Sequence, residues 1–118
     1  MNTNKIKGKR GEDIAAKFLI DKGFEILETN YYASRYGEID IIAKHKDTLV
    51  FVEVKARSTN DYGHPLESIT QTKLQKMHKA ISFYISEKKP KMKNYRMDAV
   101  AITFKPKLEI LHIENILQ

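Results

Sequence analysis

Alternating apolar and polar positions predict two adjacent strands near the middle of the chain. The three valines of the segment 48–56 would share one face of a strand, because side chains alternate with a period of two. Glu53 and Lys55 would then share the other face. A short polar segment, 45–48, separates this strand from another over 36–44. This arrangement is typical of a β-hairpin.

The register of this hairpin brings charged side chains together. We infer it by pairing Lys44 with Leu49 across the turn. Asp40 then lies opposite Glu53, on the sheet face that also carries Lys55. Facing carboxylates repel each other, and close carboxylates are what Mg²⁺ and Mn²⁺ require as ligands. The sequence therefore predicts a Mg²⁺ or Mn²⁺ site held by Asp40 and Glu53, which a register slip of one residue would abolish.

The remaining periodicity predicts helices packed on a mixed sheet. The expected helices cover 8–22 and 66–88, and the other expected strands cover 24–32, 95–104 and 107–114. A polar loop over 57–65 precedes the long helix, which acts as a crossover and leaves the next strand parallel to the third. We expect an α/β fold with about five strands, in which the valine-rich strand is central.

Composition limits the class of protein. The 118 residues form one expected domain, 1–118, with residues 1–7 flexible. The absence of cysteine excludes disulfides, zinc–thiolate sites and thiol catalysis. No apolar run resembles a signal peptide or a membrane span, so we expect a cytoplasmic protein with no membrane partner.

The net charge of +6 is concentrated near the N-terminus and between positions 73 and 96. Basic clusters beside an acidic pocket favour a nucleic acid as partner, although a solvated lysine-rich surface explains charge alone equally well. The candidate nucleic-acid contacts are Lys5, Lys7, Lys9, Arg10, Arg57, Lys73 and Lys76. Tyrosines able to stack on bases, or simply to pack, are Tyr31, Tyr32, Tyr36 and Tyr62.

Three residues are the catalytic candidates: Asp40, Glu53 and Lys55. Lys55 would orient or deprotonate the attacking water, or stabilise the transition state. An ordinary ion pair with a neighbouring carboxylate is the alternative for Lys55. Asp98 is expected to pair with Arg96 or to end a strand rather than to enter the site.

Four further residues are supporting candidates. Glu12 lies toward the apolar side of the first helix, although a first-turn acid also complements the helix dipole. Glu38 would assist the metal or neutralise Lys55, and we favour a supporting role. Gln71 and Lys73 open the second helix within reach of the site, although most polar residues at such positions are solvated.

The chain carries an ordered set of motifs, namely Gly11-Glu12, Gly37-Glu38-Ile39-Asp40, the segment 51–55, the helix with Lys73, and the segment 96–102. This set resembles the YraN family, whose function is uncharacterised. The family is similar to archaeal Holliday-junction resolvases and to the restriction-endonuclease-like, PD-(D/E)XK, nucleases. This resemblance implies a three-layer α/β/α core.

The resemblance also implies roles for single residues. Asp40, Glu53 and Lys55 match the aspartate, the acid and the lysine of the nuclease motif. Glu12 matches the helix glutamate of the resolvase pattern. Ile39 stands where the motif name has proline, which weakens the signature without removing the metal-binding aspartate.

These observations lead to one function hypothesis and two alternatives. The first is a metal-dependent endonuclease that hydrolyses phosphodiester bonds of structured or branched DNA. The second is a nucleic-acid-binding module of nuclease fold with weak or no catalysis, because fold does not fix function. The third is an interaction protein whose basic surface binds an acidic protein. A homodimer is compatible with the first, because junctions are two-fold symmetric.

Overall fold

The structure, a computed structural model, describes residues 3–59, 63 and 65–117, and the side chains of 3–7, 65 and 66 lie outside the described part. The helices are α1 (Thr3–Asp21) and α2 (Gln71–Lys88), with short 3-10 helices η1 (Ser34–Tyr36) and η2 (Pro65–Ser68). The strands are β1 (Glu25–Tyr32), β2 (Glu38–His45), β3 (Thr48–Arg57), β4 (Asn94–Thr103) and β5 (Glu109–Ile113).

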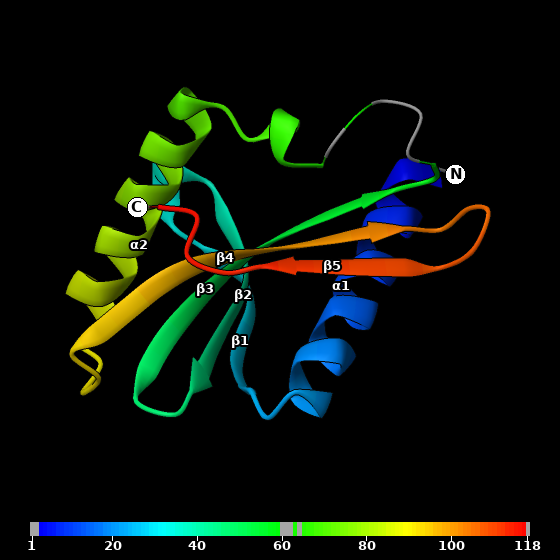
Figure 1. Cartoon of the computed structure of the whole chain (residues 1–118). Coiled ribbons are helices and arrows are strands. Elements are labelled where there is room, and N and C mark those ends of the chain that lie inside the picture. Colours follow the sequence, from blue (N-terminus) through cyan, green and yellow to red (C-terminus); the bar gives the residue numbers. More distant parts are fainter. Residues whose placement is uncertain (1–2, 60–62, 64, 118) are drawn as a thin grey trace.

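The five strands form one mixed sheet in the order β1-β2-β3-β4-β5 (Figure 1). β3 and β4 pair in parallel, and the other neighbouring strands are antiparallel. The crossover through α2 predicts this parallel pairing, and the valine-rich β3 lies in the middle of the sheet as expected. The predicted α/β fold with a five-stranded mixed sheet is confirmed.

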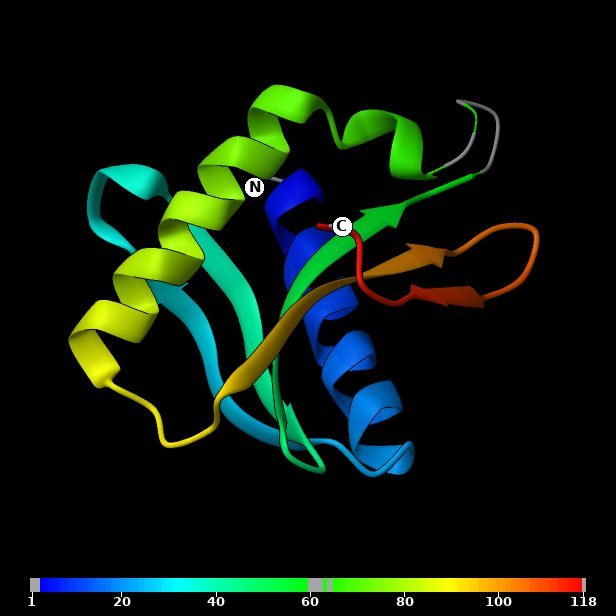
Figure 2. The ribbon, with the colours of Figure 1, turned by 60° about the vertical axis from the view of Figure 1, so that its left-hand side comes forward.

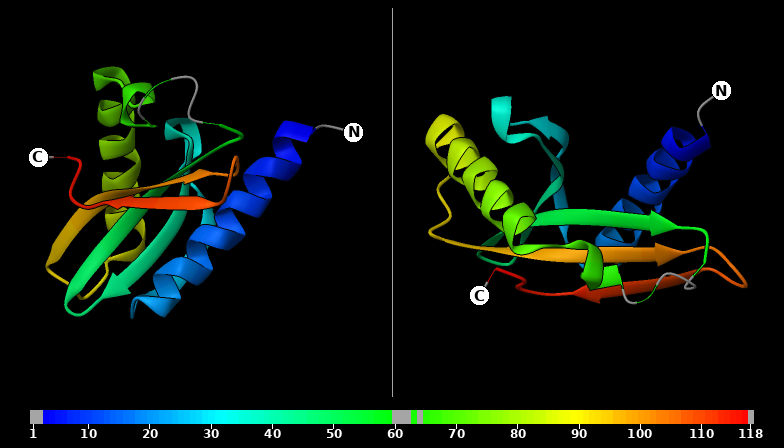
Figure 3. Two further views of the ribbon diagram at one scale, coloured as in Figure 1. Left: turned by 45° about the vertical axis from the view of Figure 1, so that its right-hand side comes forward. Right: turned by 90° about the horizontal axis from the view of Figure 1, so that it is seen from above.

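One helix covers each face of the sheet, which gives three layers (Figures 1 and 3). The α1 side of the sheet buries Leu19 against a cluster that includes Ile41, Val50 and Val100. The α2 side buries Ile81 in a second cluster, with Phe51 and Met97 among its members. Over the described residues, no helix combines the length and apolar character that a membrane crossing needs.

The hairpin between β2 and β3 has the register inferred from the sequence. Lys44 pairs with Leu49, and the ladder continues as far as the pair formed by Ile41 and Val52. Asp40 and Glu53 are therefore the positions immediately beyond the last paired residues. The two strands still lie close there, because the backbone N–H of Val54 donates a hydrogen bond of 2.8 Å to Asp40 Oδ2.

Both helices begin at a different residue from the one predicted. α1 begins at Thr3 rather than at position 8, so residues 3–7 continue the helix, and the flexibility expected for 1–7 stays a prediction. α2 begins at Gln71 rather than at position 66, because the Thr70 side chain accepts a hydrogen bond from the Lys73 backbone N–H and caps the helix. Residues 65–68 form η2 instead (Figure 2).

A close approach at Gly11 fixes where α1 lies on the sheet. A Cβ at this position would come within 2.6 Å of the Ala56 Cβ in β3. Only glycine allows the helix backbone to approach the strand this closely. The contact places the neighbouring Glu12 beside the C-terminal half of β3.

Candidate functional site

Asp40 and Glu53 lie together where β2 and β3 separate. Glu53 is only 8% exposed. Burial, followed by the negative charge of Glu53, raises the pKa of Asp40 from 3.8 to about 7, and Glu12 adds to this effect. The Val54 N–H and the charge of Lys73 act in the opposite direction without cancelling it. Two acids, Glu53 of β3 and Glu12 of α1, therefore act electrostatically on Asp40 of β2.

Two lysines share the Glu53 carboxylate. Lys73 Nζ lies 3.0 Å from Glu53 Oε1, and Lys55 Nζ lies 3.5 Å from the same oxygen. Burial and the neighbouring charge of Lys73 lower the pKa of Lys55, against the opposing pull of Glu53. Burial alone would also lower the pKa of Lys73, but Glu53 and Asp40 outweigh it and raise that pKa. Lys55 is therefore the lysine that loses its proton more readily.

Glu12 is held by a residue that the sequence did not indicate, Asn30 of β1. With its amide nitrogen facing the helix, Asn30 donates to both Glu12 carboxylate oxygens, at 3.0 and 3.1 Å. Asn30 has a φ of 53°, in the left-handed region where asparagine is favoured among non-glycine residues. It follows a β-bulge between Ile26 and Glu28. Positive φ and a bulge leave no clear sequence signal, which is why Asn30 was missed.

The supporting candidates divide into those near the cluster and those away from it. Lys73 is in direct contact with Glu53, whereas Gln71 is exposed at the first position of α2. Glu38 is exposed and pairs in the ladder with Tyr32. For Glu38 the alternative was to neutralise Lys55, but the ion pair that Lys55 forms is with Glu53.

The candidate nucleic-acid contacts lie on several elements. Lys9 and Lys76 are exposed on α1 and α2. Arg10 is exposed too, with its guanidinium 4.9 Å from the Phe104 ring centroid. Arg57, two residues after Lys55, donates to the Gly63 carbonyl, and its Nε is buried without a hydrogen-bond partner among the described residues. The side chains of Lys5 and Lys7 lie outside the described residues.

The donor chemistry of Asp40 and Glu53 fits a hard divalent cation. Among the described residues, no group of three or more histidine, aspartate or glutamate side chains is gathered closely enough to hold a metal ion. Mg²⁺, however, is usually held by one or two carboxylates, with waters and substrate phosphates as its remaining ligands. The carboxylates of Asp40 and Glu53 repel each other, which contributes to the raised pKa of Asp40. A cation between the two would relieve this repulsion.

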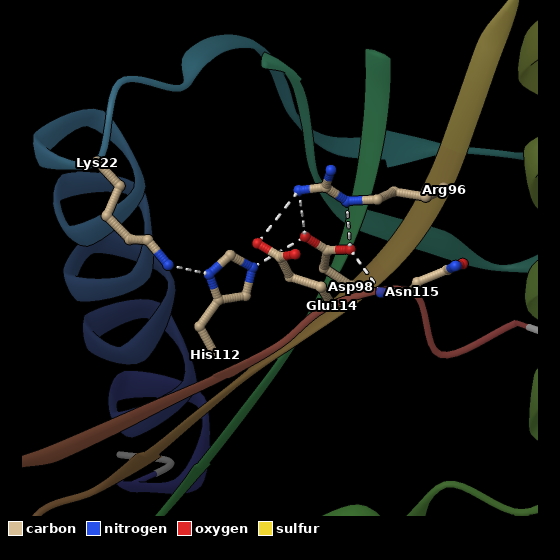
Figure 4. Close-up of polar contacts among 6 residues, drawn as sticks. All are labelled: Lys22, Arg96, Asp98, His112, Glu114 and Asn115. Atoms are coloured by element: carbon tan, nitrogen blue, oxygen red, sulfur yellow. Dashed lines mark hydrogen bonds and ion pairs between the residues drawn. The ribbon is translucent and has the colours of Figure 1, made fainter. Parts of the chain in front are cut away.

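A second buried polar cluster lies around Asp98, on the β4 and β5 side of the sheet (Figure 4). Asp98 is fully buried and accepts hydrogen bonds from Arg96 and from the backbone N–H of Asn115. His112 Nε2 lies 2.8 Å from Asp98 Oδ2, and Lys22 at the end of α1 contacts the other ring nitrogen at 2.7 Å. The expected pairing of Asp98 with Arg96 is confirmed.

This second cluster is satisfied internally. Burial alone would raise the pKa of Asp98, but hydrogen bonds from His112, Arg96 and Asn115 outweigh it and hold that pKa below its ordinary value. A carboxylate with this many partners joins α1, β4 and β5 as a structural element. It is separate from the acids around Asp40.

Comparison with known proteins assigns the chain to a family. The family model described as "Uncharacterised protein family UPF0102" matches residues 11–102. The chain belongs to UPF0102. The recognition made from the motifs is thereby confirmed, and the UPF0102 match includes every residue of the acid and lysine cluster.

Curated UPF0102 proteins cover nearly the whole chain. One from Dictyoglomus turgidum is 44% identical over 94% of this chain and 93% of its own length. One from Clostridioides difficile is 42% identical over 95% of this chain and 96% of its own. Among solved structures, Pyrococcus furiosus SfsA in complex with Ca²⁺ is 13% identical, with a TM-score of 0.37. The match covers 95% of this chain but only 64% of that longer chain.

Proposed function

We propose that this protein is a metal-dependent endonuclease of the cytoplasm that hydrolyses phosphodiester bonds of structured or branched DNA. The observation that carries the proposal is the position of Asp40 and Glu53, whose carboxylates interact beside Lys55 where the pairing of β2 and β3 ends. Repelling acids are costly to bury and persist where a cation joins them. Asp40 and Glu53 would hold Mg²⁺ or Mn²⁺, which when bound polarises a phosphate and lowers the pKa of a coordinated water.

The remaining residues of the cluster have complementary tasks. Lys55, with its lowered pKa, is unprotonated more often than an exposed lysine, so it would be available to orient or deprotonate the water that attacks phosphorus. Lys73 would hold Glu53 in place and stabilise the negative charge that develops on the phosphate oxygens. Glu12, oriented by Asn30, would accept a hydrogen bond from a water near Asp40.

The basic flanks would supply affinity. Arg57 lies at the end of β3 beyond Lys55, and Lys76 follows Lys73 along α2. Lysine and arginine contacts to phosphates give binding that weakens steeply with salt and carries little sequence preference. Such binding suits an enzyme that recognises the shape of a branched substrate.

A cleavage assay tests the proposal. Wild type is incubated with duplex, flap and four-way-junction DNA in Mg²⁺, in Mn²⁺ and in EDTA. We expect metal-dependent cleavage of at least one branched substrate, and its loss in the Asp40→Ala and Glu53→Ala variants. Asp47→Ala is the matched control, because Asp47 is an exposed carboxylate in the turn of the same hairpin. Equal behaviour of wild type and Asp40→Ala on every substrate would rule the nuclease out.

Two observations favour a second candidate function. Glu53 is already neutralised by two lysines, and no three-ligand metal group exists among the described side chains. A nucleic-acid-binding module with weak or no catalysis would have these properties. It predicts junction binding that is unchanged by Mg²⁺ and unchanged in Asp40→Ala. A homodimer with two sites is part of the nuclease proposal, and light scattering with and without a junction measures it.

A further inference from the structure

A groove runs between η1 and one face of α2, beyond the acid and lysine cluster. It consists of two adjoining cavities of about 460 and 320 Å³, and both are lined by Tyr36 and Lys79. The helix residues that line them recur at intervals of three or four positions from Thr72 to Ser86, so they share one face of α2. At a rise of 1.5 Å per residue this face is about 21 Å long.

The groove has the charge that a polyanion requires. Arg35, Lys76 and Lys79 line its wider cavity, and all three side chains are exposed. Among the described residues that line the two cavities, none is acidic. A surface with one sign of charge in a concave site concentrates ligands of the opposite sign. Phosphate groups are the ligands that arginine and lysine bind best in such a site.

The groove also offers a flat surface to a base. The Arg35 guanidinium lies 5.4 Å from the Tyr36 ring centroid, and the Phe83 ring lies 6.2 Å from the same centroid. Bases of single strands stack on aromatic rings and on guanidinium planes, whereas bases inside a duplex are already stacked on one another. The combination of ring, guanidinium and lysines therefore fits a single strand better than a duplex.

The groove continues directly from the candidate site. Lys76 lies one helical turn after Lys73, the lysine in contact with Glu53. Its side chain also passes Gly37, where an added Cβ would lie 3.6 Å from Lys76 Cε. Gly37 has a φ of 93° and directly precedes β2, three positions before Asp40. A strand held at Asp40 therefore has a basic path along α2.

We propose that the groove between η1 and α2 binds a single-stranded nucleic-acid segment that flanks the bond to be cut. Tyr36 and Arg35 hold one base, and Lys76 and Lys79 contact the phosphates. This proposal rests on the proposed nuclease function and gives it a substrate class, namely DNA with a single-stranded flap or extension. Phosphate binding in this groove explains why basic residues continue along α2 beyond Lys73, at Lys76 and Lys79.

Binding measured without cleavage tests the groove. Fluorescence anisotropy in EDTA compares a blunt duplex with the same duplex carrying a short thymidine extension. We expect wild type to bind the extended duplex at least about fivefold more tightly, as stacking of a single base allows. The variant Arg35→Gln/Lys79→Gln should lose this preference. Its log-affinity should fall less steeply with log salt, by about 0.7 in slope for the one single-strand phosphate contact that Lys79 makes.

Two further variants separate the groove from general charge and from folding. Lys105→Gln/Lys107→Gln removes the same charge from the exposed turn between β4 and β5, which lies away from α2 in Figures 1 and 2. It should keep the preference for the extension. Tyr36→Leu should lose at least about fivefold in affinity for the extended duplex with the salt slope unchanged, because stacking carries no counterion release. Thermal melts confirm that each variant is folded.

The outcomes distinguish the two proposals. Equal wild-type affinity for blunt and extended duplexes overturns the groove proposal, even if junctions are cut. Retention of the preference in Arg35→Gln/Lys79→Gln overturns it as well. The protein could prefer the extended duplex in EDTA, through Arg35, Lys79 and Tyr36, and yet cut no substrate. That result would support the groove proposal and rule out the nuclease proposal.

Discussion

The ammonium of Lys73 lies closer to the Glu53 carboxylate than the ammonium of Lys55 does, at 3.0 Å against 3.5 Å from the same oxygen. The lysine of the helix, rather than the lysine of the strand, is thus the nearer counterion of Glu53. This leaves Lys55 as a half-buried lysine with a lowered pKa beside a carboxylate that another residue neutralises. The two lysines thus differ both in their distance from Glu53 and in the direction of their pKa shifts.

Lys73→Gln should shift the titration of both Asp40 and Lys55 toward higher pH. Lys73 is among the groups that lower the pKa of each, so its removal raises both pKa values. We expect the acid limb of the cleavage profile to move to higher pH. Carboxyl NMR of the metal-free protein should show the same shift for Asp40. Lys76→Gln, three residues later and exposed, is the control, and an unchanged Asp40 titration would contradict this explanation.

Asp40→Asn should stabilise the metal-free protein while it abolishes cleavage. Folding raises the pKa of Asp40 from 3.8 to about 7, so the folded state binds the proton more tightly than the unfolded state. Stability from this group is full below pH 3.8 and is lost as pH rises to about 7. We expect Asp40→Asn to gain about 1–3 kcal/mol at pH 8 and nothing near pH 3.5.

Chemical denaturation in EDTA at the two pH values measures this gain. Asp47→Asn in the neighbouring turn is exposed and should show no such difference. Mg²⁺ should stabilise wild type but not Asp40→Asn, because a ligand stabilises only the state that binds it. Lower stability of Asp40→Asn than of wild type at pH 8 would be inconsistent with burial of a repelled carboxylate.

Asn30→Gly should reduce turnover without unfolding the chain. Glycine accepts the φ of 53° found at this position, so the substitution removes the amide and leaves the backbone unstrained. Glu12 then loses both of its hydrogen bonds to Asn30. We expect kcat to fall by about tenfold with KM almost unchanged, which corresponds to about 1.4 kcal/mol of lost positioning. A further fall of kcat from Glu12→Ala to Glu12→Ala/Asn30→Gly, as large as that of Asn30→Gly alone, would show that Asn30 does not act through Glu12.

Gly11→Ala and Gly8→Ala, one turn apart in α1, should have opposite effects on stability. A Cβ at Gly11 would lie 2.6 Å from the Ala56 Cβ, whereas nothing lies within 4 Å of a Cβ at Gly8. We expect Gly11→Ala to cost about 1–3 kcal/mol of unfolding free energy through overpacking. Gly8→Ala should gain about 0.5–1 kcal/mol, because alanine favours the helix. Urea denaturation of the two variants measures the difference. Similar midpoints for both would contradict the close contact between α1 and β3 at Gly11.

Asp98→Asn should destabilise the chain at neutral pH without entering the chemistry. Its carboxylate is buried among Arg96, His112 and Asn115, which lower its pKa. Stability from this group is therefore present at neutral pH and is lost as pH falls below the ordinary aspartate pKa. We expect a loss of about 2–4 kcal/mol at pH 7 by denaturation. Glu114→Gln, which removes a mostly exposed partner of Arg96, should change stability by less than about 1 kcal/mol.

The strands and the acids could be predicted from the sequence, whereas the contacts made by other elements could not. Alternation along β3 and the short turn fix the hairpin register, and that register places Asp40 next to Glu53. Lys73 was a supporting candidate with solvation as the alternative, and its contact with Glu53 was not foreseen because it depends on where α2 starts. The Thr70 cap sets that start, and the spacing of apolar residues does not reveal such a cap. The position of Asn30 depends on a bulge in β1, and no local sequence motif predicts that bulge.

The parallel pairing of β3 and β4 has a consequence during synthesis. The chain must leave the end of β3 and return through α2 before β4 can pair, so Lys73 reaches Glu53 only after the crossover is in place. Glu12, Asp40, Glu53 and Lys73 come from four different elements. No short fragment of the chain contains the complete cluster. A nascent or truncated polypeptide therefore carries the acids without the arrangement that would let them act, and activity would arrive only with the finished fold.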